Sequence, residues 1–382
     1  IPAWGLSNAQ AGLMAAAYAG GYMVAVPVLS ALTDRFDARR ILWLGSLFSA
    51  LATFGFALLA NGLASAMVWW GLAGASFAGA HMPGLRALTD RLDNQDSSRA
   101  VTLYTASFSL GVGLSFLVSQ WAADQWGWRW AFGLTGLGPV LMLGVASTLQ
   151  PVPPPATQGH LLDVRPVLQN RATMGYILAY GAHCFELYGM RTWLVAFWTF
   201  VTLRHPGSGL PSPMWVSVLV TLLAMPASIW GNEMSIRHGR HRAIRWIQVA
   251  SAAVALAIGW MAGDWPWLLL TLVMLYAITV PADSGSLTAG MSATAEPGLK
   301  GLTYALHSTV GFGLSALAGW LLGATLDAFG GTAQPGAWAA PLGCWRRASC
   351  AARWHCGGQA RAEADAAPPA LSVGPVNTQG AF

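Results

Sequence analysis

The chain has 382 residues, of which 55% are hydrophobic and only 9% are charged, and its formal net charge is +5. A water-soluble globule of this length cannot hide so much apolar surface, so the composition excludes an ordinary soluble domain and predicts that much of the chain faces lipid. The positive charge does not indicate a nucleic-acid partner, because no loop carries a basic stripe interleaved with aromatic residues.

Ten apolar runs of about 20 residues follow one another along the chain, the length that a helix needs to cross roughly 30 Å of hydrocarbon. None of them alternates polar and apolar residues, as the strands of a membrane barrel do. The sequence therefore predicts an all-α polytopic membrane protein, with spans at 10–32, 41–60, 64–86, 100–120, 129–149, 172–200, 213–231, 244–263, 266–288 and 302–325.

Basic residues are unevenly divided between alternate loops. One side carries only Arg129 and Arg204, so the positive-inside rule makes the other side cytoplasmic. We therefore expect a multi-pass protein of the cell (inner) membrane with residue 1 outside. Because no signal peptide or helix precedes residue 1, we expect that a first helix is missing from the chain. The thirteen basic residues of the cytoplasmic side are Arg35, Arg39, Arg40, Arg86, Arg91, Arg99, Arg165, Arg171, Arg237, Arg240, Arg242, Arg245 and Lys300.

The chain repeats itself at a distance of 202 positions. This shift lays Arg35 on Arg237 and Arg40 on Arg242, in loops that each follow a helix entering the cytoplasm. A Pro-rich stretch at 151–160 separates the two copies and is typical of a linker. Two similar halves joined by a linker indicate a transporter, and we expect an N-terminal helical half at 1–149, a cytoplasmic linker at 150–171 and a C-terminal helical half at 172–331.

The charged loop at 32–40 resembles the loop motif of the major facilitator superfamily, commonly written G-x-x-x-D-R-x-G-R-R, through Leu32, Asp34, Arg35, Arg39 and Arg40. Gly239 and Arg240 resemble a degenerate second copy. The segment GWRWAF at 127–132 is similar to the same family at the start of a helix.

The resemblance implies a fold of two pseudo-repeated six-helix bundles, in which the ten spans are helices two to eleven of twelve. It also implies a secondary active transporter, not an enzyme, that moves a small solute through the lipid bilayer by alternating access. We expect a monomer that uses no cofactor and is coupled to protons by symport. The antiporter motif of the fifth helix is absent from SLGVGLSFL at 109–117, which disfavours a drug antiporter.

The first charged loop is interpreted as a conformational latch. Asp34, at the cytoplasmic mouth of its helix, can accept hydrogen bonds from the N-terminus of a neighbouring helix, where the helix dipole is positive. The arginines would pair with acids and lipid headgroups. The alternative is that the arginines only set topology, which requires no acid. The predicted latch residues are Asp34, Arg35, Arg39, Arg40, Arg237 and Arg240.

Ionisable residues inside the spans are the candidates for the substrate and proton pathway, because each is expensive in a bilayer unless it is paired or solvated. Four of them fall on the helices that, by the resemblance, line the central cavity: His81, His183, Glu186 and Asp283. The complete set is His81, His183, Glu186, Arg191, Asp283 and His307.

His183 and Glu186 are spaced i, i+3 and share one face of their helix. We expect them to form the proton-carrying pair, with Glu186 as the coupling residue. Asp283 and His307 are expected in the cytoplasmic halves of their helices, where they pair as an inner gate or belong to the proton path. For each of these residues the alternative is an interhelical hydrogen bond with no other role.

Two further candidates keep alternatives open. Arg191 is interpreted as snorkelling toward the outer interface or paired with Glu186, and an anionic substrate would use it instead. His81 precedes Pro83, where a kink frees backbone carbonyls, so its ring either contacts the ligand or satisfies such a carbonyl.

The tail at 332–382 contains no 20-residue apolar run, although two matched halves require a twelfth helix. We expect this tail to be disordered or aberrant, from a shifted reading frame, so that the chain is incomplete. The spacing of Cys344, Cys350 and Cys356 does not indicate a zinc site, and no metal is predicted.

Three alternatives to an active transporter are a transporter fragment, a membrane enzyme and a sensor. An incomplete, non-functional transporter fragment is the alternative. A polytopic membrane enzyme is disfavoured because the spans contain no HExxH, GxSxG or paired aspartates. A sensor is disfavoured because no segment outside the spans is long enough for a soluble signalling domain.

Overall fold

The computed structural model describes residues 4, 8–92, 97–154, 161–262 and 264–338. Within these ranges the secondary structure is helical and contains no strand. Nine helical stretches of the described chain are long and apolar enough to cross a membrane. The prediction of an all-α polytopic membrane protein is confirmed.

The first half contains α1 (Asn8–Ala31), η2 (Leu32–Asp34), α2 (Ala38–Leu59), α3 (Leu63–Thr89), α4 (Ser97–Trp126), α5 (Trp128–Thr135) and α6 (Leu137–Thr148). These helices cover the first five predicted spans. The fifth span differs, because its helix breaks at Gly136 into α5 and α6.

The second half contains α7 (Arg165–Gln169), α8 (Arg171–Arg204), α9 (Pro213–His238), α10 (Arg240–Trp260), α11 (Pro266–Thr279), η3 (Pro281–Asp283), α12 (Ser284–Thr294), η4 (Pro297–Leu299) and α13 (Lys300–Ala328). The predicted span 266–288 is interrupted at Pro281, which has no N–H to continue the helix. Among the ten predicted spans, α8 falls outside the nine apolar stretches of the described chain because His183, Glu186 and Arg191 lie in its middle.

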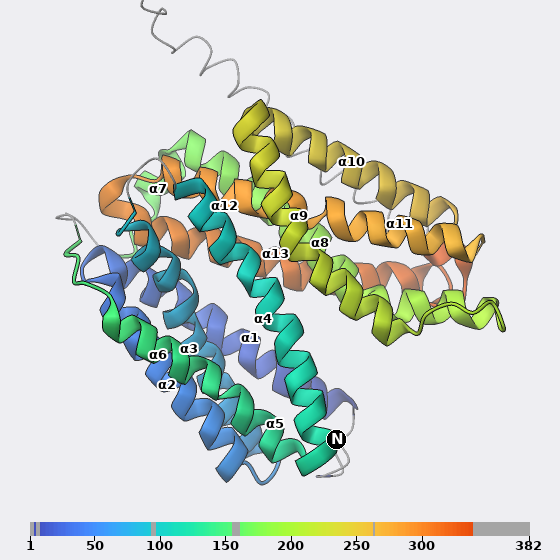
Figure 1. Cartoon of the computed structure of the whole chain (residues 1–382), viewed down its shortest axis with the longest axis horizontal. Helices are drawn as coiled ribbons and strands as arrows, with labels where there is room; N and C mark the ends of the chain where they lie inside the picture. Colours follow the sequence, from blue (N-terminus) through green and yellow to red (C-terminus); the bar gives the residue numbers. More distant parts are fainter. Residues whose placement is uncertain (1–3, 5–7, 93–96, 155–160, 263, 339–382) are drawn as a thin grey trace, which may run out of the picture.

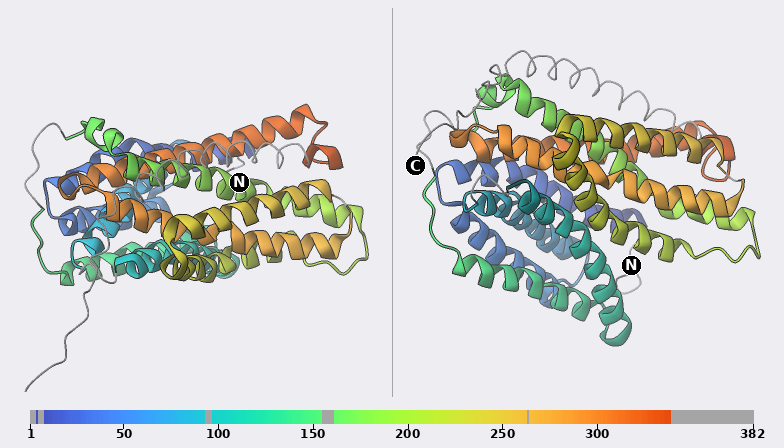
Figure 2. Two further views of the ribbon diagram at one scale, coloured as in Figure 1. Left: turned by 90° about the horizontal axis from the view of Figure 1, so that it is seen from above. Right: turned by 45° about the horizontal axis from the view of Figure 1, so that its top comes forward.

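The helices are arranged in two bundles (Figure 1). In the first, α3 packs between α1 and α2, and a Cβ atom on Gly21 would overlap the backbone of Gly71, so only small residues permit this approach. In the second, α8 packs along α13. The bundles contact each other through α1 with α13 and through α4 with α9 and α12, an arrangement that the two further views in Figure 2 also show.

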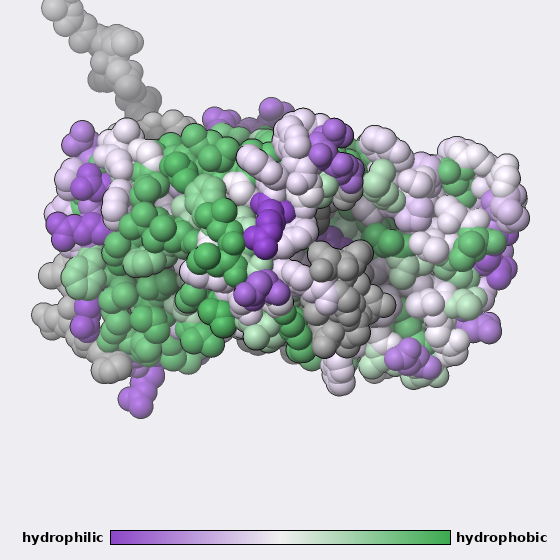
Figure 3. Space-filling view, turned by 90° about the horizontal axis from the view of Figure 1, so that it is seen from below, coloured by the Kyte–Doolittle hydropathy of each residue, from purple (hydrophilic) through white to green (hydrophobic). Residues whose placement is uncertain are grey.

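The surface of the bundles is suited to lipid. Leu58, Leu141 and Leu203 are exposed on the outside of the helices, and Figure 3 shows a broad hydrophobic area on the left half of this face, with hydrophilic residues at its left edge and others in the middle and at the right end of the face. One end of the bundles carries Arg35, in the loop between η2 and α2, and Arg91, directly after α3, and we call it the arginine-rich end.

Exposed tryptophans gather at the opposite end. They begin or end helices there, as expected for an aromatic belt at a membrane interface: Trp126, Trp130, Trp260, Trp265 and Trp267.

The start of the predicted tail is packed against the second bundle. Trp338 is buried, its ring contacts that of Phe197 at 5.1 Å between centroids, and its indole N–H donates to the carbonyl of Thr332 at 3.0 Å. The rest of the predicted tail, 339–382, lies outside the described residues.

Candidate functional site

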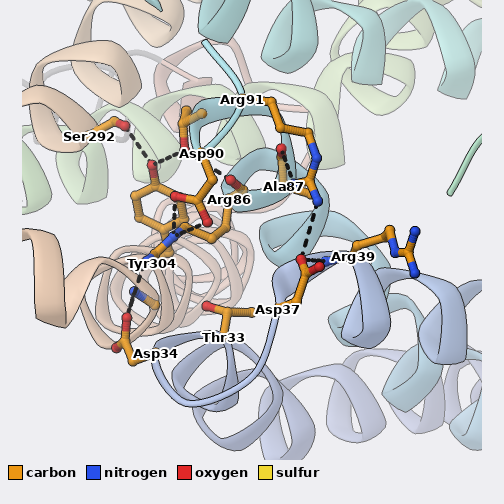
Figure 4. Close-up of polar contacts among 12 residues, drawn as sticks. Thr33, Asp34, Asp37, Arg39, Arg86, Ala87, Asp90, Arg91, Ser292 and Tyr304 are labelled. Atoms are coloured by element: carbon orange, nitrogen blue, oxygen red, sulfur yellow. Dashed lines mark hydrogen bonds and ion pairs between the residues drawn. The ribbon is translucent and has the colours of Figure 1, made fainter. Parts of the chain in front are cut away.

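Asp34 joins the two bundles at the arginine-rich end (Figure 4). Its Oδ1 accepts the backbone N–H of Gly301 at 2.7 Å, and its Oδ2 accepts that of Leu302 at 2.8 Å. Because α13 begins at Lys300, the carboxylate lies on the first turn of a helix from the other half, where unsatisfied N–H groups and the helix dipole favour a negative charge. This is the contact that the sequence analysis expects for Asp34.

Arg86, which was expected from the sequence only as one of the basic residues that set topology, completes this cluster. Its Nη1 lies 3.0 Å from Oδ1 of Asp34, and its Nε donates to both oxygens of Asp90 at 2.7 and 2.8 Å. The Arg86 side chain is only 1% exposed. Asp90 four residues after Arg86 on a helix was the signal that could have identified this arginine as paired.

Tyr304 extends the cluster across three helices. Its hydroxyl lies 3.2 Å from that of Thr89 on α3 and 2.5 Å from that of Ser292 on α12 (Figure 4). The arginine-rich end is therefore joined by buried polar contacts between the halves.

Asp37 and Arg39 hold the first half together instead. The Asp37 carboxylate caps α2 by accepting from the N–H of Arg39 at 2.9 Å, and it also accepts from Arg91 at 3.2 Å and from the N–H of Val152 at 3.1 Å. The Arg39 guanidinium donates to the carbonyl of Leu149 at 2.5 Å. These contacts fix the loop to the end of α6. The side chains of the other two predicted latch arginines in this loop, Arg35 and Arg40, are exposed.

A second contact between the halves lies where α4 begins. Arg99 donates to both oxygens of Glu233 at 2.6 and 3.0 Å, and Arg240 donates to Ser98 at 3.0 Å. Ser98 in turn donates to Asn232 at 3.0 Å. The Arg240 contact thus joins the halves.

The second contact matches the first by the internal repeat. Ile236 stands at the position that the repeat matches to Asp34, and Glu233, nearly one turn earlier on α9, supplies the acid. Because the repeat matches Ile236 and not Glu233 to Asp34, Glu233 was not among the predicted latch residues. The predicted latch residue Arg237, one turn after Glu233, is exposed.

A small cavity lies between the halves at mid-depth. Its volume is about 60 Å³, and it is lined by residues of α3, α4, α8, α9, η3, α12 and α13. Three predicted pathway residues line it: His81, His183 and Arg191. Aromatic side chains, including those of Tyr180 and Phe312, form much of the remaining wall.

His183 pairs with Asp283, not with Glu186 as expected. Nδ1 of His183 lies 2.7 Å from Oδ1 of Asp283, and the amide of Gln248 donates to Oδ2 at 3.1 Å. Both members of the pair are 3% exposed. The break at Pro281 allows Asp283 to meet α8, which helical spacing within α8 alone does not reveal.

Glu186 lies next to this pair but has other partners. Its Oε1 accepts from the hydroxyls of Ser251 at 2.5 Å and Tyr276 at 2.9 Å, which belong to α10 and α11. The expected pair of Glu186 with His183 is therefore wrong, because hydroxyl donors of the second bundle meet the carboxylate.

His307 does not pair with Asp283, and the expectation of such a pair is wrong. It is fully buried and its ring stacks on Tyr180 with 3.8 Å between centroids. Neither ring nitrogen has a hydrogen-bond partner within the described chain.

Arg191 enters the cavity with few partners. Its Nη2 donates to the hydroxyl of Ser109 at a long 3.4 Å, and its guanidinium carbon lies 5.9 Å from the centre of the Tyr188 ring. The described residues provide no ion pair for it, so the expected pair with Glu186 is wrong.

His81 contributes its ring to the cavity wall. The ring stacks on Phe77 with 5.3 Å between centroids, and the backbone carbonyl of His81 accepts from the hydroxyl of Tyr104 at 2.6 Å. Among the described residues, no group of three His, Cys, Asp or Glu side chains is placed to hold a metal ion.

Comparison with known proteins gives a family match over most of the chain. The model of the Major Facilitator Superfamily matches residues 2–320. A solved structure, the human organic anion transporter MFSD10 (TETRAN), superimposes with a TM-score of 0.70 over 90% of this chain and 83% of that chain, at 17% sequence identity. That likeness concerns the fold.

Curated relatives are similar over shorter stretches. Dipeptide and tripeptide permease A of Erwinia pyrifoliae is 30% identical over 36% of this chain and 29% of its own length. Human protein spinster homolog 1 is 23% identical over 50% of this chain and 39% of its own length. The sphingosine-1-phosphate transporter SPNS2 of Xenopus tropicalis is 25% identical over 50% of this chain and 38% of its own length. The chain thus spans less than half the length of these relatives.

Proposed function

The chain belongs to the major facilitator superfamily, and from that premise we propose that it is a secondary active transporter that moves a small solute by alternating access in symport with protons. The observation that carries the proposal is the cavity between the two halves, with the buried His183 in its wall, Asp283 paired to that histidine and the Asp34 contact closing one end. We place the protein in the cell (inner) membrane as a monomer, with the arginine-rich end in the cytoplasm.

The structure corresponds, in this proposal, to the state closed to the cytoplasm. The contacts of Asp34 with α13 and of Thr89 with Tyr304 join the halves at the arginine-rich end. Opening that end requires Asp34 to leave the N-terminus of α13. Asp34 and Arg86 therefore act as the latch, while Asp37 and Arg39 keep the first half rigid.

The proposed proton carrier is the pair of His183 and Asp283. With one shared proton the pair is neutral overall, and without it the pair has one net negative charge. A net charge buried in a membrane is unfavourable unless water or a counter-ion reaches it. The pair therefore releases its proton when the cavity opens to water, which links proton movement to the change of access.

The test is uptake by the full chain in liposomes that contain a pH indicator. The first solutes are those that the names of the relatives mention, dipeptides, tripeptides and sphingosine 1-phosphate, followed by small acids, sugars and amines. We expect uptake that rises with an inward proton gradient and an internal acidification that starts when the solute is added. Uptake that ignores the gradient contradicts proton coupling, and folded protein that moves no solute contradicts transport.

A further inference from the structure

Arg191 carries a permanent charge that the described protein does not neutralise. A guanidinium has five N–H donors, and one of them makes the long contact to Ser109. Nε is buried and has no hydrogen-bond partner within the described chain. In the low dielectric of a membrane interior, an unpaired cation is strongly unfavourable.

Other arginines of the same protein are satisfied. Arg86 meets two carboxylates, and Arg91 meets one carboxylate and two backbone carbonyls. Arg129 donates to the carbonyls that end α2, at 2.9 to 3.3 Å. Arg191 therefore differs from them in facing the cavity with its donors still available.

The nearby acids are already engaged. Asp283 contacts His183, and Glu186, just over one turn before Arg191 on α8, accepts from Ser251 and Tyr276 of the second bundle. Around the guanidinium the cavity instead offers the Ser109 hydroxyl and the rings of Tyr188 and Phe312. This wall suits one anionic group attached to an apolar or aromatic body.

We propose that Arg191 is the anchor for a carboxylate of the transported solute, so that the solute is a small organic anion. The inference rests on the proposed transport function and names the substrate class of the same cavity. A bidentate pair between carboxylate and guanidinium would use donors that have no acceptor in the described chain. The cavity volume of about 60 Å³ is well below the roughly 150 Å³ of a protein cavity that holds benzene, so an aromatic solute enters only when the halves move apart.

The experiment measures ligand binding to the purified full chain by thermal shift and direct titration. The probes are carboxylates with their amide isosteres, phenylacetate with phenylacetamide and benzoate with benzamide. The variants are Arg191→Gln, Arg191→Lys and, as matched control on the same helix, Arg204→Gln, which changes an exposed arginine beside Phe200.

We expect carboxylates, but not amides, to bind the wild type and Arg204→Gln. Binding becomes about tenfold to a hundredfold weaker in Arg191→Gln and is partly kept in Arg191→Lys. Without ligand, Arg191→Gln melts no lower than the wild type, since it removes an unneutralised charge. If Arg191 only stabilised the fold, Arg191→Gln would melt at a lower temperature than the wild type.

Three results overturn the inference: no carboxylate binding by the wild type, equal binding of the amides, or unchanged carboxylate binding in Arg191→Gln. The uptake assay separates this failure from failure of the proposed function. Uptake of neutral solutes that is insensitive to Arg191→Gln leaves transport intact and rejects the anion anchor. Carboxylate binding that depends on Arg191, without uptake of any solute, supports the anion anchor and contradicts the proposed transport function.

Discussion

The carboxylate of Asp34 lies 3.0 Å from the guanidinium of Arg86, and both side chains are buried although 52 residues separate them. Both residues belong to the first half, yet the same carboxylate also caps α13 of the second half through Gly301 and Leu302. Arg86 therefore holds the acid in position, and Asp34 is the member of the pair that joins the halves.

Asp34→Asn should open the arginine-rich end more often. An amide has one acceptor oxygen where the carboxylate has two, so its NH2 group would face a backbone N–H or the Arg86 guanidinium. Each charge-assisted hydrogen bond contributes about 1.5–3 kcal/mol, so losing one lowers the ratio of closed to open protein by about tenfold or more. The measurement is the rate at which a maleimide labels Cys introduced by Thr102→Cys, a buried site packed against Gly285 of the other half.

Asp37→Asn is the matched control, because this carboxylate lies three residues away and its hydrogen bonds within the described chain go to Arg39, Arg91 and Val152, all in the first half and its linker. It should leave the labelling rate within about twofold of wild type while lowering the melting temperature, since the partly buried ion pair with Arg91 is lost although Asn can still cap α2. Equal acceleration by both variants would contradict the assignment of Asp34 as the latch.

Gly301→Ala should give the same opening without changing any charge. A Cβ atom on Gly301 would overlap the Thr33 hydroxyl and the Ser30 carbonyl and would lie 3.0 Å from Cγ of Asp34. The start of α13 must then move away from η2, which lengthens the hydrogen bonds to Asp34. The same Thr102→Cys labelling assay measures the effect.

Gly313→Ala provides the comparison on the same helix, because no other atom lies within 4 Å of its added Cβ. Alanine is the better helix former, so this variant should melt at an equal or higher temperature and label like wild type. If Gly301→Ala is also labelled at the wild-type rate, the close approach of η2 and α13 does not keep the arginine-rich end closed.

Glu233→Gln should have little effect, although Glu233 also joins the halves. Its partner Arg99 is 56% exposed and Glu233 is 29% exposed, and solvent screens the attraction in such a pair so that it contributes little to stability. We expect a change below about fivefold in Thr102→Cys labelling, and less at high salt. If Glu233→Gln accelerated the labelling more than Asp34→Asn does, the contact between α4 and α9 would be the main one that keeps this end closed.

The fold was largely predictable from sequence, because membrane spans leave a strong signal in length and hydropathy. All ten predicted spans correspond to helices, including α8, whose polar residues lower its hydropathy. The breaks at Gly136 and Pro281 were not predicted. Neither interrupts the apolar run, so hydropathy does not reveal where the helix is broken.

The side-chain pairs were less predictable, because they depend on how helices face one another. Spacing i, i+3 put His183 beside Glu186, but α10, α11 and η3 supply competing partners for both. The contact of Asp34 with a helix N-terminus was expected from its place at a helix end. Its partner Arg86 was missed, since an arginine at the end of a span also fits a topological role.

The orientation can be tested with single cysteines in exposed positions at the two ends. Gln125→Cys lies near the end of α4 opposite the arginine-rich end, and Phe36→Cys lies in the first charged loop. With thirteen basic residues on one side, we expect an impermeant maleimide added outside intact cells to label Gln125→Cys only. Labelling of Phe36→Cys from outside would reverse the orientation.

Asp283→Asn should abolish solute accumulation driven by a pH gradient and leave exchange between the two sides. The amide cannot accept a proton, so His183 loses the charged partner 2.7 Å away and the pair no longer alternates between neutral and negative. Exchange requires no net proton movement and therefore survives. Accumulation and counterflow in the same liposomes measure the two activities.

Glu186→Gln is the matched carboxylate control for this prediction. Glu186 lies on the same helix as His183, but its hydroxyl partners belong to α10 and α11, and Gln keeps an oxygen that can accept from both Ser251 and Tyr276. We expect accumulation to stay within about threefold of wild type. If Glu186→Gln abolishes accumulation while Asp283→Asn does not, Glu186 is the coupling residue and the His183–Asp283 pair is structural. Loss in both variants would mean that the two neighbouring carboxylates act as one proton-binding unit, because α10 supplies Gln248 to one and Ser251 to the other.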